Sequence, residues 1–205
     1  MDGWWDCERI DEMMYKLYSA QLQIAEHMQT PATMLGVLAG KILPQGSKSR
    51  SHEIGKYHYD LGNELFEPML GPSMVYTCAY WADGARTLEE AQNAKMDRVC
   101  RKLQLEPGMK LLDIGCGFGA FAKFAAENYG AHVTGISVSN EQLKYARKFC
   151  EGLPVEFRHL DYRDIREKFD RIASIGMFEA VGKRYFRKFM ESAQSCLTDD
   201  GIFVL

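Results

Sequence analysis

From about Thr87 onward, short apolar runs alternate with segments whose apolar residues recur every three or four positions. Apolar runs of this length are typical of buried strands, and the longer period is typical of helices covered on one face. The pattern predicts strands over residues 110–114, 132–136, 155–159, 170–175 and 201–205. It predicts helices over residues 87–105 and 118–129, from Ser139 onward, and over 183–197. Such alternation indicates a doubly wound, mainly parallel α/β sheet with right-handed crossovers.

The first fifty residues show a different arrangement of apolar positions. A helical period runs over residues 8–28, and a shorter helix is expected over about 30–43. The proline, glycine and serine residues of 44–51 indicate a linker. We therefore predict a partial helical region over residues 1–50 and an α/β core over residues 51–205. The polar face of the first helix carries acidic as well as basic residues, which favours packing on a missing partner over lying on a membrane surface.

Composition narrows the classes of protein to which the chain can belong. Its 205 residues, 46% of them apolar, are enough to build a hydrophobic core. The formal net charge of −3 gives no reason to expect a nucleic acid partner. Six cysteines without a Cys-x-x-Cys pair argue against a metal site or a disulfide framework and favour a reducing cytoplasm. No apolar run reaches the roughly 18 residues of a membrane span, so we expect any membrane contact to be peripheral.

Both ends of the sequence are unusual for a complete domain. Trp4 and Trp5 stand close to the start, and the apolar run 201–205 closes the chain without a following turn. We therefore expect a fragment truncated at both ends, with the C-terminal strands of the sheet missing.

The stretch from Leu111 to Gly119 carries the strongest chemical signal. A short apolar run that contains Asp113 is followed by glycines at positions 115, 117 and 119. Glycines at this spacing let the backbone pass close under a ligand and direct the N–H groups of the following helix toward it. The block resembles the first motif of the class I S-adenosylmethionine (SAM) methyltransferases. That resemblance implies a Rossmann-like fold with Asp113, Gly115 and Gly117 near the methionine part of SAM.

A dinucleotide site is the main alternative for this loop. Gly115, Gly117 and Ala120 fit the loose G-x-G-x-x-G/A pattern. An NAD site would also need an acidic residue at the end of the next strand, about twenty residues on. That strand instead runs into Ser137-Val138-Ser139-Asn140. NAD is therefore disfavoured, and an arginine-based NADP variant is left open.

Three further segments precede the sheet or follow its strands. One combines residues 57–63, YHYDLGN, with residues 76–81, YTCAYW; the others are residues 159–164, HLDYRD, and residues 176–182, GMFEAVG. In this order and spacing they closely resemble the cyclopropane-fatty-acyl-phospholipid synthases and the related mycolic acid cyclopropane synthases. The resemblance runs from Trp4 to the last residue. It implies transfer of the SAM methyl group to the cis double bond of a phospholipid acyl chain, followed by proton removal that closes a three-membered ring.

The resemblance also implies roles for individual residues near the reacting carbon atoms. In that family a bound bicarbonate is the base, and Cys78 and Glu179 match two of the residues that hold it. Glu179 is expected to be buried, where a carboxylate without partners would be costly. Tyr80, Trp81 and Phe178 are candidates to shield a carbocation, with plain core packing as the alternative reading.

The same resemblance assigns the cofactor contacts. Glycines lie under the methionine part, the segment after the second strand lies around the ribose, and Asp161 with Tyr162 borders the adenine. Asp161 could instead cap the turn that follows it. The expected SAM-binding residues are Tyr76, Thr77, Asp113, Gly115, Gly117, Ser137, Val138, Gln142, Asp161 and Tyr162.

Two departures from the family pattern bear on activity. Ala180 stands where the family often has His after the motif glutamate, and the family's later His and Tyr would follow Leu205. We therefore expect these 205 residues to bind SAM weakly and to make no cyclopropanes. The implied setting is the inner face of the cytoplasmic membrane, with a homodimer left open. The basic residues Lys183, Arg184, Arg187 and Lys188 fit either a solvated helix face or contact with anionic headgroups.

Two rival functions remain open. One is a related SAM methyltransferase that acts on a small amine, or on an alkene without ring closure. The other is a non-catalytic module that binds lipid or SAM, which the retained Cys78 and Glu179 disfavour.

Overall fold

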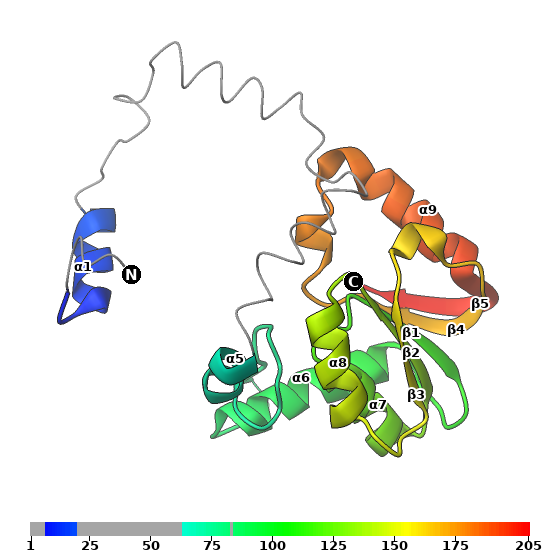
Figure 1. The fold of residues 1–205 in the computed structure, drawn as a ribbon, viewed down its shortest axis with the longest axis horizontal. Helices are drawn as coiled ribbons and strands as arrows, with labels where there is room; N and C mark the ends of the chain where they lie inside the picture. Colours follow the sequence, from blue (N-terminus) through cyan, green and yellow to red (C-terminus); the bar gives the residue numbers. More distant parts are fainter. Residues whose placement is uncertain (1–6, 20–62, 83) are drawn as a thin grey trace, which may run out of the picture. The chain divides into compact units, whose positions relative to one another are not determined.

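Five strands form one parallel sheet in the computed structural model, which describes residues 7–19, 63–82 and 84–205. The strand order is β3-β2-β1-β4-β5, so β1 lies at the centre (Figure 1). The strands are β1 (Lys110–Ile114), β2 (His132–Ser137), β3 (Val155–His159), β4 (Phe169–Ala173) and β5 (Leu197–Val204). Their parallel pairing confirms the predicted α/β class.

The predicted strand bounds hold closely for the first three strands and less well for the last two. β5 begins four residues before its predicted start, at Leu197, which pairs with Phe169 of β4. The register between these strands then shifts, and Arg171 pairs with Ile202. The polar residues 198–200 inside the irregular part of β5 hide the start of the strand from a pattern based on apolar runs.

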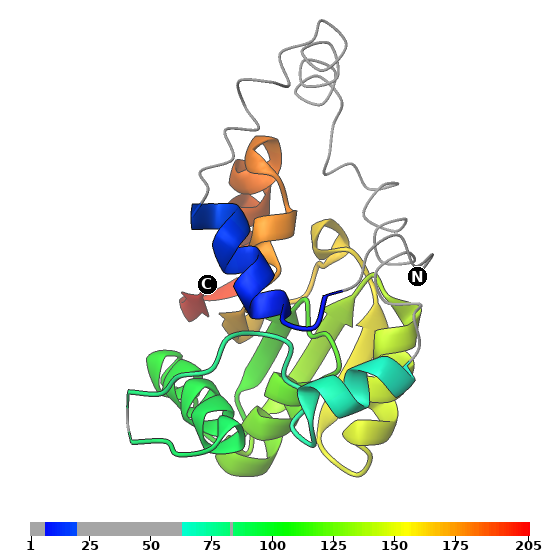
Figure 2. The ribbon, with the colours of Figure 1, turned by 90° about the vertical axis from the view of Figure 1, so that its left-hand side faces the viewer.

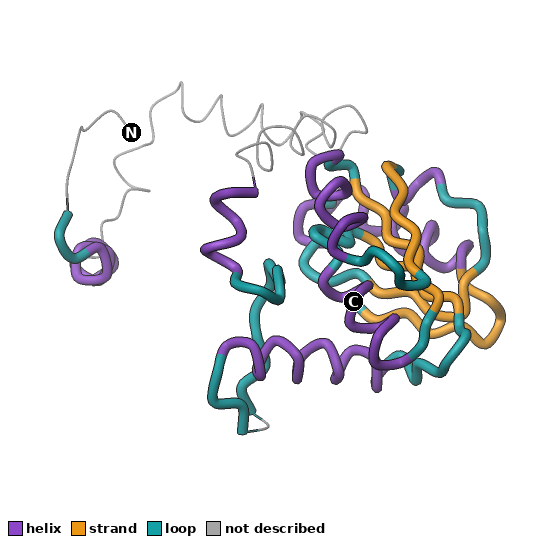
Figure 3. Tube along the Cα trace, turned by 60° about the horizontal axis from the view of Figure 1, so that its bottom comes forward, coloured by secondary structure: helices purple, strands orange, loops and turns teal. Residues whose placement is uncertain are grey.

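Helices cover both faces of the sheet. The main ones are α6 (Leu88–Lys102), α7 (Ala120–Tyr129), α8 (Asn140–Phe149) and α9 (Phe186–Cys196), with 3₁₀ turns η1 (Tyr162–Asp164), η2 (Phe178–Ala180) and η3 (Lys183–Tyr185). α6, α7 and α8 lie on one face and α9 on the other. Figure 3 shows helices on both sides of the strands. The predicted capping box of α6 is present, since Thr87 Oγ1 accepts from the Glu90 amide and Glu90 Oε2 accepts from the Thr87 amide.

The hydrophobic core consists of two clusters separated by the sheet. Leu111 of β1 belongs to the cluster under α6, α7 and α8, whereas Leu112 and Ile114 belong to the cluster under α9. Because successive side chains of a strand point to opposite faces, Asp113 lies on the same face as Leu111. This alternation directs the Asp113 carboxylate toward α6 and α7.

A smaller cluster attaches the segment before the sheet. Helix α5 (Asn63–Leu70) contributes Phe66, which packs with Met74 and with Phe118 of the glycine loop. Figure 2 shows α5 and the connection to α6 beside α7 and α8. This packing holds residues 74–77 next to the glycine loop.

The chain divides into two units, Met1–Pro44 and Gln45–Leu205. In the first unit, α1 (Ile10–Ser19) confirms the described part of the predicted helix. The rest of that helix, the predicted shorter helix, the linker and residues 57–62 of the first motif lie outside the described residues. The boundary at residue 50 stays a prediction. In the described ranges, no helix is both long and apolar enough to cross a membrane.

Candidate functional site

A cavity of about 260 Å³ lies at the carboxyl ends of β1, β2 and β4. Parallel sheets of this type place their ligands at that edge, because the loops after neighbouring strands converge there. Its wall comes from the segment before α6, α6 itself, the glycine loop, the start of α8 and the loops after β3 and β4. Residues expected to contact SAM all line this one cavity: Tyr76, Thr77, Asp113, Gly115, Gly117, Ser137, Val138, Gln142, Asp161 and Tyr162.

The glycine loop forms the floor of the cavity. Gly115, Gly117 and Gly119 have φ values of 85°, 53° and 86°, which side chains disfavour. α7 therefore begins at Ala120, two residues later than predicted, because Gly119 is left-handed. Ala120 and Phe121 line the cavity, and no side chain of the described residues caps the first amides of α7. These N–H donors and the positive end of the helix dipole suit an anionic or polar ligand group.

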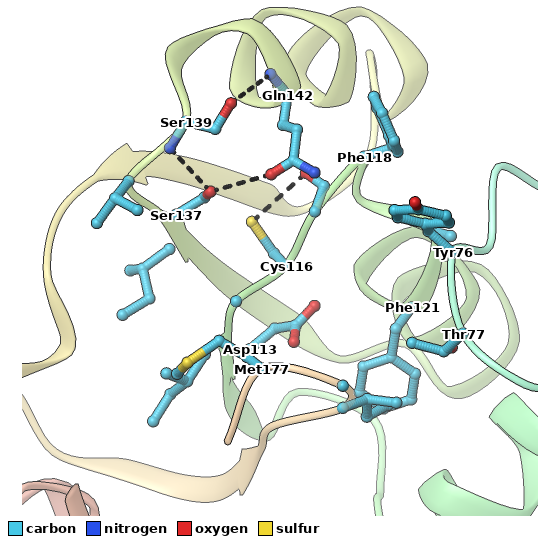
Figure 4. A pocket seen from close by; sticks show the side chains of 18 of the residues that line it. Tyr76, Thr77, Asp113, Cys116, Phe118, Phe121, Ser137, Ser139, Gln142 and Met177 are labelled. Carbon is cyan, nitrogen blue, oxygen red and sulfur yellow. Dashed lines mark hydrogen bonds between the residues drawn. The ribbon is translucent and has the colours of Figure 1, made fainter. Parts of the chain in front are cut away.

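Asp113 is a buried acid in the cavity wall. Its residue is 2% exposed, and its Oδ2 has no hydrogen-bond partner within the described residues. Figure 4 shows the carboxylate pointing into the space between the glycine loop and Thr77. Burial raises the pKa of Asp113 to about 7, and the positive charge of Lys95 opposes the rise. A buried carboxylate with an open oxygen is suited to a cationic donor from a ligand.

Lys95 lines the cavity but was missed by the sequence analysis. Its Nζ donates to Thr77 Oγ1 at 2.5 Å, and Gln92 Nε2 donates to the Thr77 carbonyl at 3.1 Å. Burial lowers the pKa of the Lys95 ammonium, and the nearby Cys78 and Asp113 act in the opposite direction. Its position in the sequence could have pointed to the cavity, because Lys95 lies three residues after Gln92 and one before Met96, at the edge of the buried face of α6.

The wall on the β2 side is a network of hydrogen bonds at the start of α8 (Figure 4). Ser139 is the predicted cap of α8, and its Oγ accepts from the Gln142 amide at 3.3 Å. The Ser139 amide donates to Ser137 Oγ at 3.1 Å, and Ser137 Oγ donates to Gln142 Oε1 at 3.3 Å. Ser139 lines the cavity as well and was expected only as a cap. The network fixes the Gln142 amide against the cavity.

Asp161 both caps a turn and lines the cavity. Its Oδ1 accepts from the Arg163 amide at 3.0 Å, which is the capping alternative left open by the sequence. Its carboxylate also holds the Arg163 guanidinium, with Oδ2 at 2.7 Å from Nη2. The neighbouring Tyr162 packs edge-on against Phe189, with ring centroids 5.0 Å apart. These contacts hold the Asp161 carboxylate in a fixed position, and the Arg163 guanidinium balances its charge.

The two expected catalytic residues are not in the cavity wall. Cys78 is exposed beside Lys95, and Glu179 is exposed on η2. The prediction that Glu179 is buried was wrong, and with it the argument from the cost of a buried carboxylate. On the short turn η2, Phe178 takes the inward position and stacks on Phe186 at 4.2 Å, which leaves Glu179 facing out. The roles of Cys78 and Glu179 stay predictions.

The aromatic residues considered for carbocation shielding also lie away from the described wall. Tyr80 accepts a hydrogen bond from Arg98 at 2.8 Å, and the Arg98 guanidinium lies 4.6 Å above its ring. Trp81 is 52% exposed, and Phe178 packs in the cluster under α9. The aromatic rings in the wall are instead those of Tyr76, Phe118, Phe121 and Tyr162.

Comparison with known proteins gives a consistent set of relatives. The family model described as mycolic acid cyclopropane synthetase matches residues 46–205. Cyclopropane-fatty-acyl-phospholipid synthase of Escherichia coli strain K12 is 46% identical over 100% of this chain and 53% of that protein. The chain thus spans about half the length of this relative.

Solved structures show the same fold. The cyclopropane synthase MmaA2 from Mycobacterium tuberculosis matches with a TM-score of 0.70 and 38% identity, over 74% of this chain and 55% of that one. Mycolic acid cyclopropane synthase CmaA1, complexed with SAH and CTAB, matches with a TM-score of 0.71 and 35% identity, over the same 74% and 55%.

Proposed function

The chain belongs to the mycolic acid cyclopropane synthetase family. We propose that it is the SAM-binding part of an enzyme that transfers a methylene group from SAM to the cis double bonds of unsaturated phospholipid acyl chains. The product of this reaction is a cyclopropane fatty acid. The observation that carries the proposal is the single cavity lined by all ten residues that the family resemblance assigns to the cofactor. These residues come from four segments far apart in the sequence, and a purely structural packing would not require their polar groups to share one space.

The cavity fits SAM in its chemistry as well as in its position. Among the described residues, the buried Asp113 carboxylate has one oxygen without a partner, which suits the ammonium of the methionine part. The glycine loop brings backbone close to the ligand, and Ser137 and Gln142 offer polar groups to a ribose. Tyr76 and Thr77 cover the methionine part, and Asp161 with Tyr162 would border the adenine. SAM bound there supplies an electrophilic methyl group.

The described wall suits an alkene acceptor better than an acceptor that must lose a proton before it attacks the methyl group. An alkene needs no deprotonation before it attacks a methyl group, so orientation and exclusion of water are the main requirements. Phe121, Met177 and Val181 provide an apolar wall near the glycine loop. The face of an aromatic ring also stabilises nearby positive charge without reacting with it.

Bicarbonate does not fit the described residues by themselves. Cys78 and Glu179, its two expected neighbours, are both exposed and stand outside the cavity wall. Methyl transfer to a lipid double bond without ring closure is the second candidate; its product has the same composition, because the proton leaves a neighbouring chain carbon instead of the new methyl group.

We also propose a peripheral membrane setting at the cytoplasmic face, where the phospholipid substrate would be reached. The basic residues of η3 and α9 support it, since their side chains are exposed and could approach anionic headgroups. These residues are Lys183, Arg184, Arg187 and Lys188.

The test incubates the chain with SAM and vesicles of a monounsaturated phospholipid, and analyses the fatty acids by mass spectrometry. The longest open reading frame that contains the chain is tested in parallel. A product that gains one CH₂ and resists hydrogenation supports cyclopropane formation. A product that gains one CH₂ and takes up hydrogen supports the second candidate.

The control is Asp113→Asn, which keeps the shape of the side chain and removes its charge. It should lower product formation in either case. Binding of S-adenosylhomocysteine (SAH) by the chain, with no lipid product from the longest open reading frame that contains it, would contradict the lipid substrate and favour a small-molecule acceptor. Vesicle binding without SAH binding would instead favour a non-catalytic lipid-binding module.

A further inference from the structure

Lys95 has a half-buried ammonium whose bonding capacity is only partly used. It has three N–H donors, and the hydrogen bond that it forms within the described residues goes to Thr77 Oγ1. The side chain lines the cavity, so its remaining donors have a ligand space beside them. Burying a charged group with unused donors costs free energy, which is the cause of the lowered pKa of Lys95.

Asp113 presents the opposite case in the same wall. Its carboxylate is nearly fully buried and its Oδ2 has no partner in the described parts of the chain. Lys95 and Asp113, both among the described residues, influence one another electrostatically, yet no ion pair joins them there. The cavity therefore contains one half-buried cation and one buried acidic group, close enough to attract each other and both open to a ligand.

The position of Lys95 is fixed by its hydrogen bond to Thr77. Thr77, which accepts its hydrogen bond, is held in turn by Gln92 through the backbone carbonyl. Its methyl group also abuts the loop after β4, where a Cβ on Gly176 would lie 2.6 Å from Thr77 Cγ2. A lysine held in this way presents its donors in one place, which reduces the entropy lost when a ligand binds.

We propose that Lys95 binds the carboxylate of the amino-acid end of SAM, opposite Asp113, which binds the ammonium of the same group. The inference rests on the proposed SAM site and goes beyond it, because it makes this pair of residues the determinant of specificity for a free α-amino-acid terminus. A zwitterion neutralises both buried charges at once. A ligand that lacks either group leaves one of them unpaired, and sites with unpaired buried groups reject such ligands strongly.

A merely structural role for Lys95 is the competing explanation. In that case it would only hold Thr77 and the segment before α6 against the cavity. Its removal would then weaken every ligand that touches this wall, whatever the charge of the ligand. Ligands that differ only in the amino-acid end separate the two explanations.

The experiment measures calorimetric binding of three ligands to the 205-residue chain. SAH carries the complete amino-acid end, its decarboxylated analogue keeps only the amine, and methylthioadenosine lacks both groups. Lys95→Met should weaken SAH by about 10- to 100-fold and change the other two less than about twofold. Asp113→Asn should weaken SAH and the decarboxylated analogue and spare methylthioadenosine.

Two further variants keep the test interpretable. Lys102→Met removes an exposed lysine from the same helix and should leave all three affinities unchanged. Lys95→Arg retains the positive charge and should keep more SAH affinity than Lys95→Met. Circular dichroism melting identifies any variant that fails to fold.

Other outcomes overturn the inference in distinguishable ways. Equal weakening of all three ligands by Lys95→Met would assign Lys95 a structural role and leave the SAM site intact. Wild-type affinity for SAH no higher than for methylthioadenosine would show that the pair recognises no zwitterion. Failure of the wild-type chain to bind any of the three would contradict the proposed SAM site itself, and the inference with it.

Discussion

Gly115 and Met177 approach each other so closely that a Cβ at position 115 would lie 2.6 Å from the Cβ of Met177. The contact presses the loop after β1 against the loop after β4, and both loops line the cavity. Glycine is thus required at position 115 for two reasons: its φ is 85°, and the Met177 side chain leaves no room for a Cβ.

Gly115→Ala should therefore damage the cavity more than backbone strain alone would. We expect SAH affinity to fall at least about tenfold, because Met177 must move into the ligand space. Gly152→Ala is the matched control, since Gly152 has a φ of 82° and a Cβ added there would meet no described atom within 4 Å. Gly152→Ala should lose about 1–2 kcal/mol of unfolding free energy in urea through backbone strain, and Gly115→Ala should lose about 1–3 kcal/mol more through the clash with Met177. Only Gly115→Ala should lose affinity. Equal affinities in the two variants would contradict the steric role of Met177.

Ligand binding should be coupled to proton release at Asp113. The free protein holds the pKa of this carboxyl at about 7, and a bound ammonium would lower it. At pH 7 the free carboxyl is about half protonated, so SAH binding should release about half a proton. Affinity should accordingly rise as pH increases through 7. Titration calorimetry in buffers of different ionisation enthalpy measures the release, which should vanish in Asp113→Asn.

Asp113 should also make the unliganded fold less stable as pH rises. Its folded pKa lies above the ordinary value of 3.8, so the native state binds more protons than the unfolded state between about pH 4 and 7. The stability contribution of the neutral carboxyl is present below that window and is lost as pH rises through about 7. Asp113→Asn should gain about 1–3 kcal/mol relative to wild type at about pH 8 and little at about pH 4. Urea unfolding at both pH values tests this, and an equal difference at both would contradict it.

The N-caps of α6 and α8 should differ in their effect on ligand binding. Thr87 caps α6 away from the cavity, whereas Ser139 caps α8 and belongs to the cavity wall. Thr87→Ala should cost about 0.5–2 kcal/mol of unfolding free energy and leave SAH affinity unchanged. Ser139→Ala should cost a similar amount and also weaken SAH, because the Ser137–Gln142 network loses its support. Unfolding curves and calorimetry on both variants decide the point.

Local signals accounted for most of the elements around the site. The glycine spacing after β1 predicts the loop, because glycine is the residue that best tolerates the left-handed backbone there. This signal lies in neighbouring residues of the sequence and needs no tertiary contact. The caps at Thr87 and Ser139 were predictable for the same reason, since each bond spans three residues. The start of β5 was not predictable, because its polar residues are tolerated only by the irregular pairing with β4.

The sequence by itself determined the α/β alternation and the glycine loop, because these depend on backbone sterics and on the spacing of apolar residues along the chain. The expected cofactor residues came from the family resemblance, and their role stays a prediction. Only the tertiary structure decided which charges are buried. Lys95 acquires its role by meeting Thr77, eighteen positions earlier, and Asp113 of β1. Glu179 loses its expected burial because Phe178 takes the inward position on η2. Burial and charge pairing arise from packing between distant segments, which no local pattern encodes.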